Sequence, residues 1–190
     1  MNAVAPISWA ETRSRMASDH ARLRRVLREA GREPVGWLAL HPSYTAVWLH
    51  RVSHFLHRGG HRWLARFVWH LNLLVVGADI SPASEIGGGF VMLNPVAVTI
   101  FANIGRDFTV MAFCGLGALP SRQDIGAGPG LPILGDDVEL APFAGVLGPV
   151  RLGNGVRVGA GCIVTEDLPD GAIVARPVPR ILPSLRSREA

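Results

Sequence analysis

The feature that most constrains this chain is an aliphatic residue at every sixth position through its second half. A six-residue period matches neither the 3.6-residue repeat of an α-helix nor the two-residue alternation of a strand. It is typical of a solenoid in which three short parallel strands form each coil. The periodic residues are Ile80, Ile86, Met92, Val98, Ile104, Val110 and Leu116 in a first run, then Leu134, Leu140, Val146, Leu152, Val158 and Val164.

Before the repeat, apolar residues recur at helical spacing. This pattern predicts three helices over residues 17–31, 42–56 and 61–76, with Gly31 and the pair Gly59-Gly60 as stops. The expected organisation is a flexible arm (1–16), an α-helical cap (17–76), a parallel β-helix (77–182) interrupted by a loop (119–132), and a flexible tail (183–190).

Charge is unevenly distributed along the chain. Up to His70 there are 11 Arg and four acidic residues, whereas the remainder has eight Arg and 11 acidic residues. The basic cap has two interpretations: its arginines form a solvated helix surface, or they form a surface that attracts an acidic partner. Because nothing else favours nucleic acid, no nucleic-acid partner is predicted, and no segment is apolar enough to predict a membrane span.

The two cysteines are predicted to fill the core. Cys114 lies four residues after Val110, and Cys162 lies four residues after Val158, a position that faces the interior of the solenoid. Thiols in apolar surroundings are unreactive. With only two cysteines and no signal peptide, the expected location is the cytoplasm.

Histidines at helical spacing in the cap raise the question of a metal. His50, His54 and His57 share a helix face, and imidazoles so spaced can bind zinc. The alternative is packing within the cap, which we favour, and no metal is predicted.

Four segments together resemble the serine O-acetyltransferase branch of the hexapeptide acyltransferases. They are HPSYTAVWLHRVSHFL (41–56), GADISPASEIGGGF (77–90), LGPVRLGNGVRVGAGCIV (147–164) and DLPDGAIVARPVPRIL (167–182). The resemblance implies a mainly β fold, a left-handed parallel β-helix preceded by a small α-helical cap. It also implies a homotrimer or a dimer of trimers, and transfer of an acetyl group from acetyl-CoA to serine. In that family a His deprotonates the hydroxyl, an Asp orients that His, and the site lies between subunits.

The catalytic positions of this chain depart from the family pattern. The Asp-His pair of the family falls on Leu93-Asn94, and the Arg-His pair of its loop falls on Gly130-Leu131. All seven histidines precede residue 71, so the β-helix contains none. An amide has no basicity that could replace an imidazole near neutral pH.

Three residues are predicted as catalytic or acceptor-binding. Asp79 matches a substrate-binding Asp of the family and could bind an amine, or it could cap the first turn. Asn94 could hold the acceptor by hydrogen bonds, or it could be a plain corner residue. Asp124, in the loop sequence SRQDIGAGPG, could be a replacement base if burial raises its pKa.

The expected cofactor is an acyl-CoA or a carrier-protein thioester. The resemblance assigns its contacts to Ala144 and Arg157 and to the turn formed by Gly159, Ala160 and Gly161. The preceding turn is altered, because Pro142 lacks the backbone N–H that the family offers there and Phe143 adds a ring.

Three functions remain open from the sequence. The first is an acyltransferase of a bacterial biosynthetic pathway with altered donor or acceptor, acting on a small molecule and binding an acidic acyl carrier protein. The second is an enzyme of another reaction on the same trimeric scaffold. The third is a non-catalytic homologue that binds and regulates an active enzyme.

Overall fold

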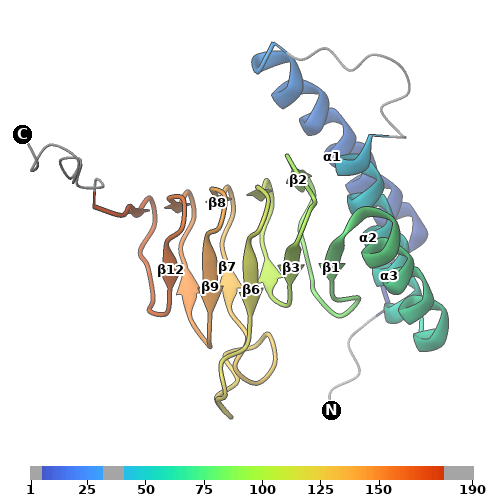
Figure 1. Ribbon diagram of the computed structural model, residues 1–190. Coiled ribbons are helices and arrows are strands. Elements are labelled where there is room, and N and C mark those ends of the chain that lie inside the picture. Colours follow the sequence, from blue (N-terminus) through green and yellow to red (C-terminus); the bar gives the residue numbers. More distant parts are fainter. Residues whose placement is uncertain (1–5, 32–40, 178–190) are drawn as a thin grey trace, which may run out of the picture.

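The computed structural model describes residues 6–31 and 41–177. Three helices form a cap at one end of the molecule: α1 (Trp9–Glu29), α2 (Pro42–Arg58) and α3 (Arg62–Val76). A solenoid extends away from them, and the C-terminal coils lie at its far end (Figure 1). The predicted order of cap and solenoid is confirmed, whereas residues 1–5 and the predicted tail (183–190) lie outside the described ranges.

The first helix is longer than predicted. It begins at Trp9, within the segment expected to be a flexible arm, so the arm prediction for residues 9–16 is wrong. Ser8 caps the helix by accepting a hydrogen bond from the backbone N–H of Glu11 at 3.1 Å. This Ser-x-x-Glu pattern is a recognised helix start and could have been read from the sequence.

The solenoid consists of short strands that pair in parallel only. They are β1 (Ala78–Ile80), β2 (Val91–Met92), β3 (Val98–Ile100), β4 (Asn103–Ile104), β5 (Thr109–Val110), β6 (Gly115–Gly117), β7 (Ile133–Leu134), β8 (Glu139–Leu140), β9 (Gly145–Leu147), β10 (Arg151–Leu152), β11 (Arg157–Val158), β12 (Ile163–Val164) and β13 (Ile173–Val174). Three sheets result, with orders β1-β3-β6-β9-β12, β10-β7-β4 and β13-β11-β8-β5-β2. Each sheet forms one side of a three-sided prism, which confirms the predicted parallel β-helix.

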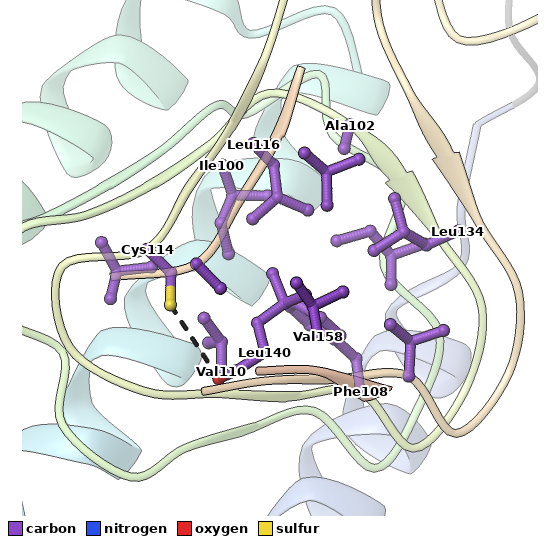
Figure 2. Close-up of a cluster of buried hydrophobic side chains, with 14 of the residues drawn as sticks. Ile100, Ala102, Phe108, Val110, Cys114, Leu116, Leu134, Leu140 and Val158 are labelled. Atoms are coloured by element: carbon purple, nitrogen blue, oxygen red, sulfur yellow. Dashed lines mark hydrogen bonds between the residues drawn. The ribbon is translucent and has the colours of Figure 1, made fainter. Parts of the chain in front are cut away.

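The predicted periodic residues fill the interior of this prism. Leu116, Leu134, Leu140 and Val158 point inward together, as Figure 2 shows, and each is at most 2% exposed. Burying an aliphatic side chain of this size contributes about 1.5–3 kcal/mol. The hexad repeat therefore supplies the main driving force for folding the β-helix.

The register of the repeat shifts by two residues at β3 and returns at Ile104 of β4, which pairs with Ile86. Ile80 is paired with Ile100, and Val98 is paired with Ala78. Val98 therefore occupies the smaller interior position two residues before the repeat position, and Ile100 takes the repeat position itself. The turn after β2 is two residues longer than a regular hexad turn, which corrects the unbroken register expected from the sequence.

Both cysteines lie in the core as predicted. Cys114 is 1% exposed and Cys162 is 5% exposed. The Cys114 thiol lies 3.1 Å from the carbonyl oxygen of Ala141, and its position inside the prism is visible in Figure 2. Burial raises the pKa of this thiol, which favours the protonated, unreactive form.

A loop interrupts the repeat within the described range 41–177. Val110 is paired with Leu140, 30 positions later, whereas Leu140 is paired with Val158, 18 positions later. The additional residues form an excursion between β6 and β7 that projects from one edge of the prism (Figure 1).

Glu85 links the cap to the first coil. Its carboxylate accepts hydrogen bonds from Arg15 at 2.5 Å and Arg58 at 2.7 Å, and it lies 3.2 Å from His54 Nε2. Burial alone would raise the pKa of this carboxyl. The hydrogen bonds and charges of His54 and Arg15 outweigh that effect and lower the pKa to about 2.

The lowered pKa of Glu85 predicts a loss of stability in acid. The ionised carboxylate stabilises the fold fully above its unfolded pKa near 4.5, and this contribution disappears as the pH falls towards 2. We expect Glu85→Gln to be less stable than the wild type at pH 7 and nearly equal to it at pH 2. Urea titrations at a series of pH values measure the difference. Glu166→Gln, at an exposed turn, is the control, and a Glu85→Gln deficit independent of pH would contradict the expectation.

Candidate active site

Along one edge of the prism, successive turns each contain a residue whose backbone has the left-handed (αL) conformation. Backbone N–H groups connect successive turns along it: Ala97 to Gly77, Phe113 to Val96, Phe143 to Ala112 and Gly161 to Pro142, all at 3.0–3.1 Å. The turn residues Gly77, Ala97, Phe113, Phe143 and Gly161 have φ between 54° and 78°. This edge, which we call the αL edge, joins the sheet that ends in β13 to the sheet that begins with β1.

Asn94 lies on the αL edge, in the enlarged turn after β2. Its side chain is exposed, and Oδ1 accepts a hydrogen bond from the backbone N–H of Val96 at 3.1 Å. This contact shapes the turn and leaves the amide N–H₂ facing outward. Asn94 can therefore donate to a ligand, but it cannot accept a proton.

Two aromatic rings lie further along the αL edge. Phe113 and Phe143 stack with centroids 4.8 Å apart and an interplanar angle of 4°, and both remain about half exposed. Their φ values are 61° and 63°, a conformation that costs a bulky L-residue about 1–2 kcal/mol. The ring pair is thus retained in spite of backbone strain.

This strain predicts an unusual order of stability. Phe143→Gly should be more stable than Phe143→Ala by about 1 kcal/mol, because glycine adopts φ of 63° without a penalty and alanine does not. Ala97→Gly, at φ 54° on the same edge, should likewise increase stability. Urea denaturation of the three variants tests this, and a more stable Phe143→Ala would contradict it.

Asp79 lies on the outer face of β1, next to the cap. Its Oδ1 accepts a hydrogen bond from Trp69 Nε1 at 2.8 Å, and its strand neighbour is Thr99. The contact joins α3 to β1 and leaves the second carboxylate oxygen available to a ligand. Asp79 therefore has both a structural partner and the capacity to bind a cation.

Beside Asp79 is a groove that the sequence did not predict. It has a volume of about 200 Å³, and its walls include Thr99, Phe101, Leu131 and Leu147. Gly115 and Gly117 form its floor, and a Cβ atom at either glycine would meet open space. Glycine at these two outward positions of β6 is what keeps the groove open. Leu131 of the loop covers one side.

Asp124 stabilises the loop on which it lies. Its Oδ1 accepts hydrogen bonds from the backbone N–H groups of Gly126 at 2.8 Å and Gly128 at 3.0 Å. The residue is exposed, and both of these contacts hold the loop backbone rather than aim the carboxylate into a cavity. The arrangement favours a structural role for Asp124 within one subunit.

The predicted cofactor residues are distributed over two places. Gly159, Ala160 and Gly161 form the last turn on the αL edge, where a Cβ at Gly161 would meet Arg176. Arg157 lies on the neighbouring face and pairs with Asp137 Oδ2 at 2.8 Å and Glu139 Oε2 at 3.4 Å.

Ala144 is placed unfavourably for cofactor binding. It is 1% exposed. Its N–H donates to Ala141 and its carbonyl accepts from Gly115, both at 3.1 Å. This placement argues against direct contact with a cofactor.

The single chain thus brings only part of the predicted site together. Asn94 and the Gly159–Gly161 turn lie on the αL edge. Asp79 lies two residues after Gly77, which is the first turn residue of that edge. Asp124 projects from a different edge, after β6. In the described ranges no three His, Cys, Asp or Glu side chains converge to hold a metal ion.

The prism, its interrupting loop and its helical cap place this chain in the class of hexapeptide-repeat proteins with a left-handed β-helix. Residues 132–166 match the family described as bacterial transferase hexapeptide (six repeats). A Helicobacter pylori serine acetyltransferase is 33% identical over 154 residues, which cover 79% of this chain and 88% of that protein. The chain therefore belongs to the serine acetyltransferase family.

Other relatives support the assignment to this family, and they show that the chain matches only part of the length of some members. A Mycobacterium tuberculosis serine acetyltransferase is 33% identical over 136 residues, and the match spans 70% of this chain but 58% of that protein. The soybean serine acetyltransferase apoenzyme structure has a TM-score of 0.75 at 29% identity, covering 88% of this chain and 68% of that one. The Neisseria gonorrhoeae enzyme, at 23% identity and a TM-score of 0.75, supports the fold. Among the described helices, none is both long and apolar enough to cross a membrane.

Proposed function

We propose that this chain is a cytoplasmic acyltransferase that transfers an acyl group from a thioester to a small molecule without a histidine base in its β-helix. The observation that carries this proposal is the location of histidine. All seven lie at or before residue 70, and Asn94 occupies the αL-edge position at which the family resemblance places the base. We therefore expect that the acceptor is not serine, that the donor is not acetyl-CoA, or that both differ.

The acceptor is proposed to bind between Asp79 and Asn94. A soybean serine acetyltransferase structure of 29% identity contains serine, which supports an amine-bearing acceptor here. The free oxygen of Asp79 would hold the ammonium group, and the Asn94 amide would hydrogen-bond the acceptor. The acceptor nucleophile would attack the thioester carbonyl, the C–S bond would break, and the proton of the nucleophile would pass to water or to the departing thiolate. Orientation next to the thioester would supply much of the rate enhancement, as it can when reacting groups are held in contact geometry.

The donor is proposed to approach along the αL edge. The Gly159–Gly161 turn supports binding of an acyl-CoA or of a carrier-protein thioester. Pro142 offers no N–H and Phe143 adds an exposed ring, so the path differs from the one that the family resemblance implies. The excess of arginine over acidic residues up to His70 would attract an acidic carrier protein, which supports the second donor.

The complete site is proposed to lie between subunits of a homotrimer or a dimer of trimers. In one chain the Asp124 loop projects from a different edge than the one that carries Asn94. A neighbouring subunit could bring its loop to the Asp79–Asn94 region, as the family resemblance implies. Asp124 would then contribute by shaping the loop that closes the site.

A panel of acceptors tests the proposed function. The purified protein is incubated with acetyl-CoA or an acetylated carrier protein and with L-serine or other hydroxy and amino compounds, and products are identified by mass spectrometry. We expect turnover with an acceptor other than L-serine. We also expect a rate that keeps rising with pH, without the plateau above pH about 6.5 that an unperturbed histidine base would give.

The alternative is a non-catalytic homologue. It is favoured by the ion pairs that already engage Arg157 with Asp137 and Glu139. Absence of binding by acetyl-CoA and by the carrier protein in calorimetry, together with no turnover, would favour this alternative over the acyltransferase.

A further inference from the structure

The two helices that contact the β-helix most closely contain no acidic residue. α2 carries Arg51 and Arg58, and α3 carries Arg62 and Arg66. Arg51 is paired with Asp19 and Arg58 with Glu85. By contrast, no carboxylate in the part of the chain that the structure describes forms an ion pair with Arg62 or Arg66. Positive charge is therefore concentrated at the start of α3.

These two arginines face a pocket of about 360 Å³ between the cap and the first coil. His57 of α2 and Trp69 of α3 complete its cap side, and the turn 81–83 forms the opposite side. The Trp69 indole is held in place by its hydrogen bond to Asp79. The pocket is thus an open hollow with one anchored wall, and its charged groups, the exposed Arg62 and Arg66, are cationic.

Two further observations describe the electrostatics around the pocket. The first turn of α3 contains no acidic residue, and its N-cap, His61, makes no side-chain capping hydrogen bond. The positive end of this helix dipole is therefore not compensated within α3. Burial lowers the pKa of His57, and the positive charges of His54 and Arg62 lower it further.

A small cavity lies between the pocket and the groove beside Asp79. A narrow cavity of about 30 Å³ shares Ser81 and Ala83 with the pocket, and it shares Phe101 and Leu131 with the groove. From β1 to β9 the path crosses three strand spacings, about 14 Å. A molecule larger than a single amino acid could therefore reach from the arginines past Asp79 and onto the Gly115–Gly117 floor.

We propose that His57, Arg62 and Arg66 form an oxyanion-binding site that holds a phosphate or carboxylate group of the acyl acceptor. Two guanidinium groups provide planar, charge-assisted donors suited to such a group. The acceptor would then carry an anion at a distance from its ammonium group, which Asp79 would hold, and from its nucleophile, which would lie near Asn94. This assignment rests on the proposed function, because it names the class of acceptor for the same site.

Inorganic phosphate is the probe for the site itself. Binding to the full-length protein is measured by calorimetry at constant ionic strength, for the wild type and for the double variant Arg62→Gln/Arg66→Gln. We expect the affinity for phosphate to fall by about tenfold or more. Arg24→Gln/Arg28→Gln is the matched control, since these exposed α1 arginines have the same spacing and charge. Equal losses in both double variants, or no loss in the first, would overturn the site.

Competition distinguishes an acceptor anion from a donor phosphate. If saturating CoA leaves the phosphate affinity unchanged, the site belongs to the acceptor, as proposed. If CoA displaces phosphate, and Arg62→Gln/Arg66→Gln weakens CoA binding, the anion belongs to the donor and the acceptor assignment is wrong. Failure of acyl transfer with every acceptor would instead count against the proposed function, because phosphate binding is measured independently of turnover.

Discussion

Replacing Asp19 by alanine is expected to lower the free energy of unfolding by about 3–5 kcal/mol, the largest effect of any single change considered for this chain. Asp19 and Arg51 each have 1% of their side chain exposed, and two contacts of 2.9 and 3.0 Å join them. Removing the carboxylate leaves a guanidinium buried without its counter-charge. Urea denaturation followed by circular dichroism measures the loss.

The pair also joins three elements, which is why the effect should be cooperative. Arg51 of α2 donates to the carbonyl oxygens of Ile86 and Gly87, and Asp19 of α1 accepts from the N–H of Phe90 at 2.8 Å. The first coil is thereby fixed to both helices. Asp19→Ala should unfold the cap and the β-helix in one transition at lower urea concentration.

A double variant separates the charge effect from packing. Asp19→Leu/Arg51→Met removes both charges, and such replacements are often neutral when the volume is maintained. It should recover part of the stability lost in Asp19→Ala, because the N–H of Phe90 and the carbonyl oxygen of Gly87 lose their side-chain partners in it. A loss below about 1 kcal/mol in Asp19→Ala, or a double variant no more stable than it, would contradict the role of the pair.

Much of the fold could be predicted because the hexad repeat determines both the strands and the interior. The register shift could not, since Val98 and Ile100 are both aliphatic and either one satisfies the six-residue spacing. Only the pairing of Ile80 with Ile100 distinguishes them. The start of α1 was missed for a different reason: its apolar stripe is weak near Trp9, and the signal was the cap at Ser8.

Less of the site could be predicted, because it depends on contacts between elements. The groove exists where Gly115 and Gly117 of β6 meet Leu131 of the loop and Leu147 of β9. Glycine in a coil has many structural explanations, so the sequence alone does not single these out. The anchor of Asp79 was likewise not visible, since Trp69 belongs to the helix pattern of α3.

Asp79→Asn is expected to reduce kcat/KM for the acceptor by about 100-fold while leaving the fold intact. The asparagine oxygen can still accept the hydrogen bond from Trp69 Nε1, which the aspartate accepts at 2.8 Å. What is lost is the negative charge offered to a substrate ammonium group. A hydrogen bond to a charged group contributes about 1.5–3 kcal/mol, and the upper part of that range corresponds to about 100-fold. Steady-state kinetics with the acceptor identified in the panel measures the change.

The variant Asp79→Ala distinguishes a role of Asp79 in binding the acceptor from a role in holding Trp69 in place. It removes both the charge and the acceptor for Trp69, so it should lose activity as Asp79→Asn does and, in addition, about 1 kcal/mol of stability. Glu29→Gln, which removes one negative charge from the exposed end of α1, is the control for net charge and should retain full activity. If Asp79→Asn keeps wild-type kinetics and only Asp79→Ala is impaired, Asp79 acts by anchoring Trp69. The acceptor ammonium must then bind elsewhere along the groove.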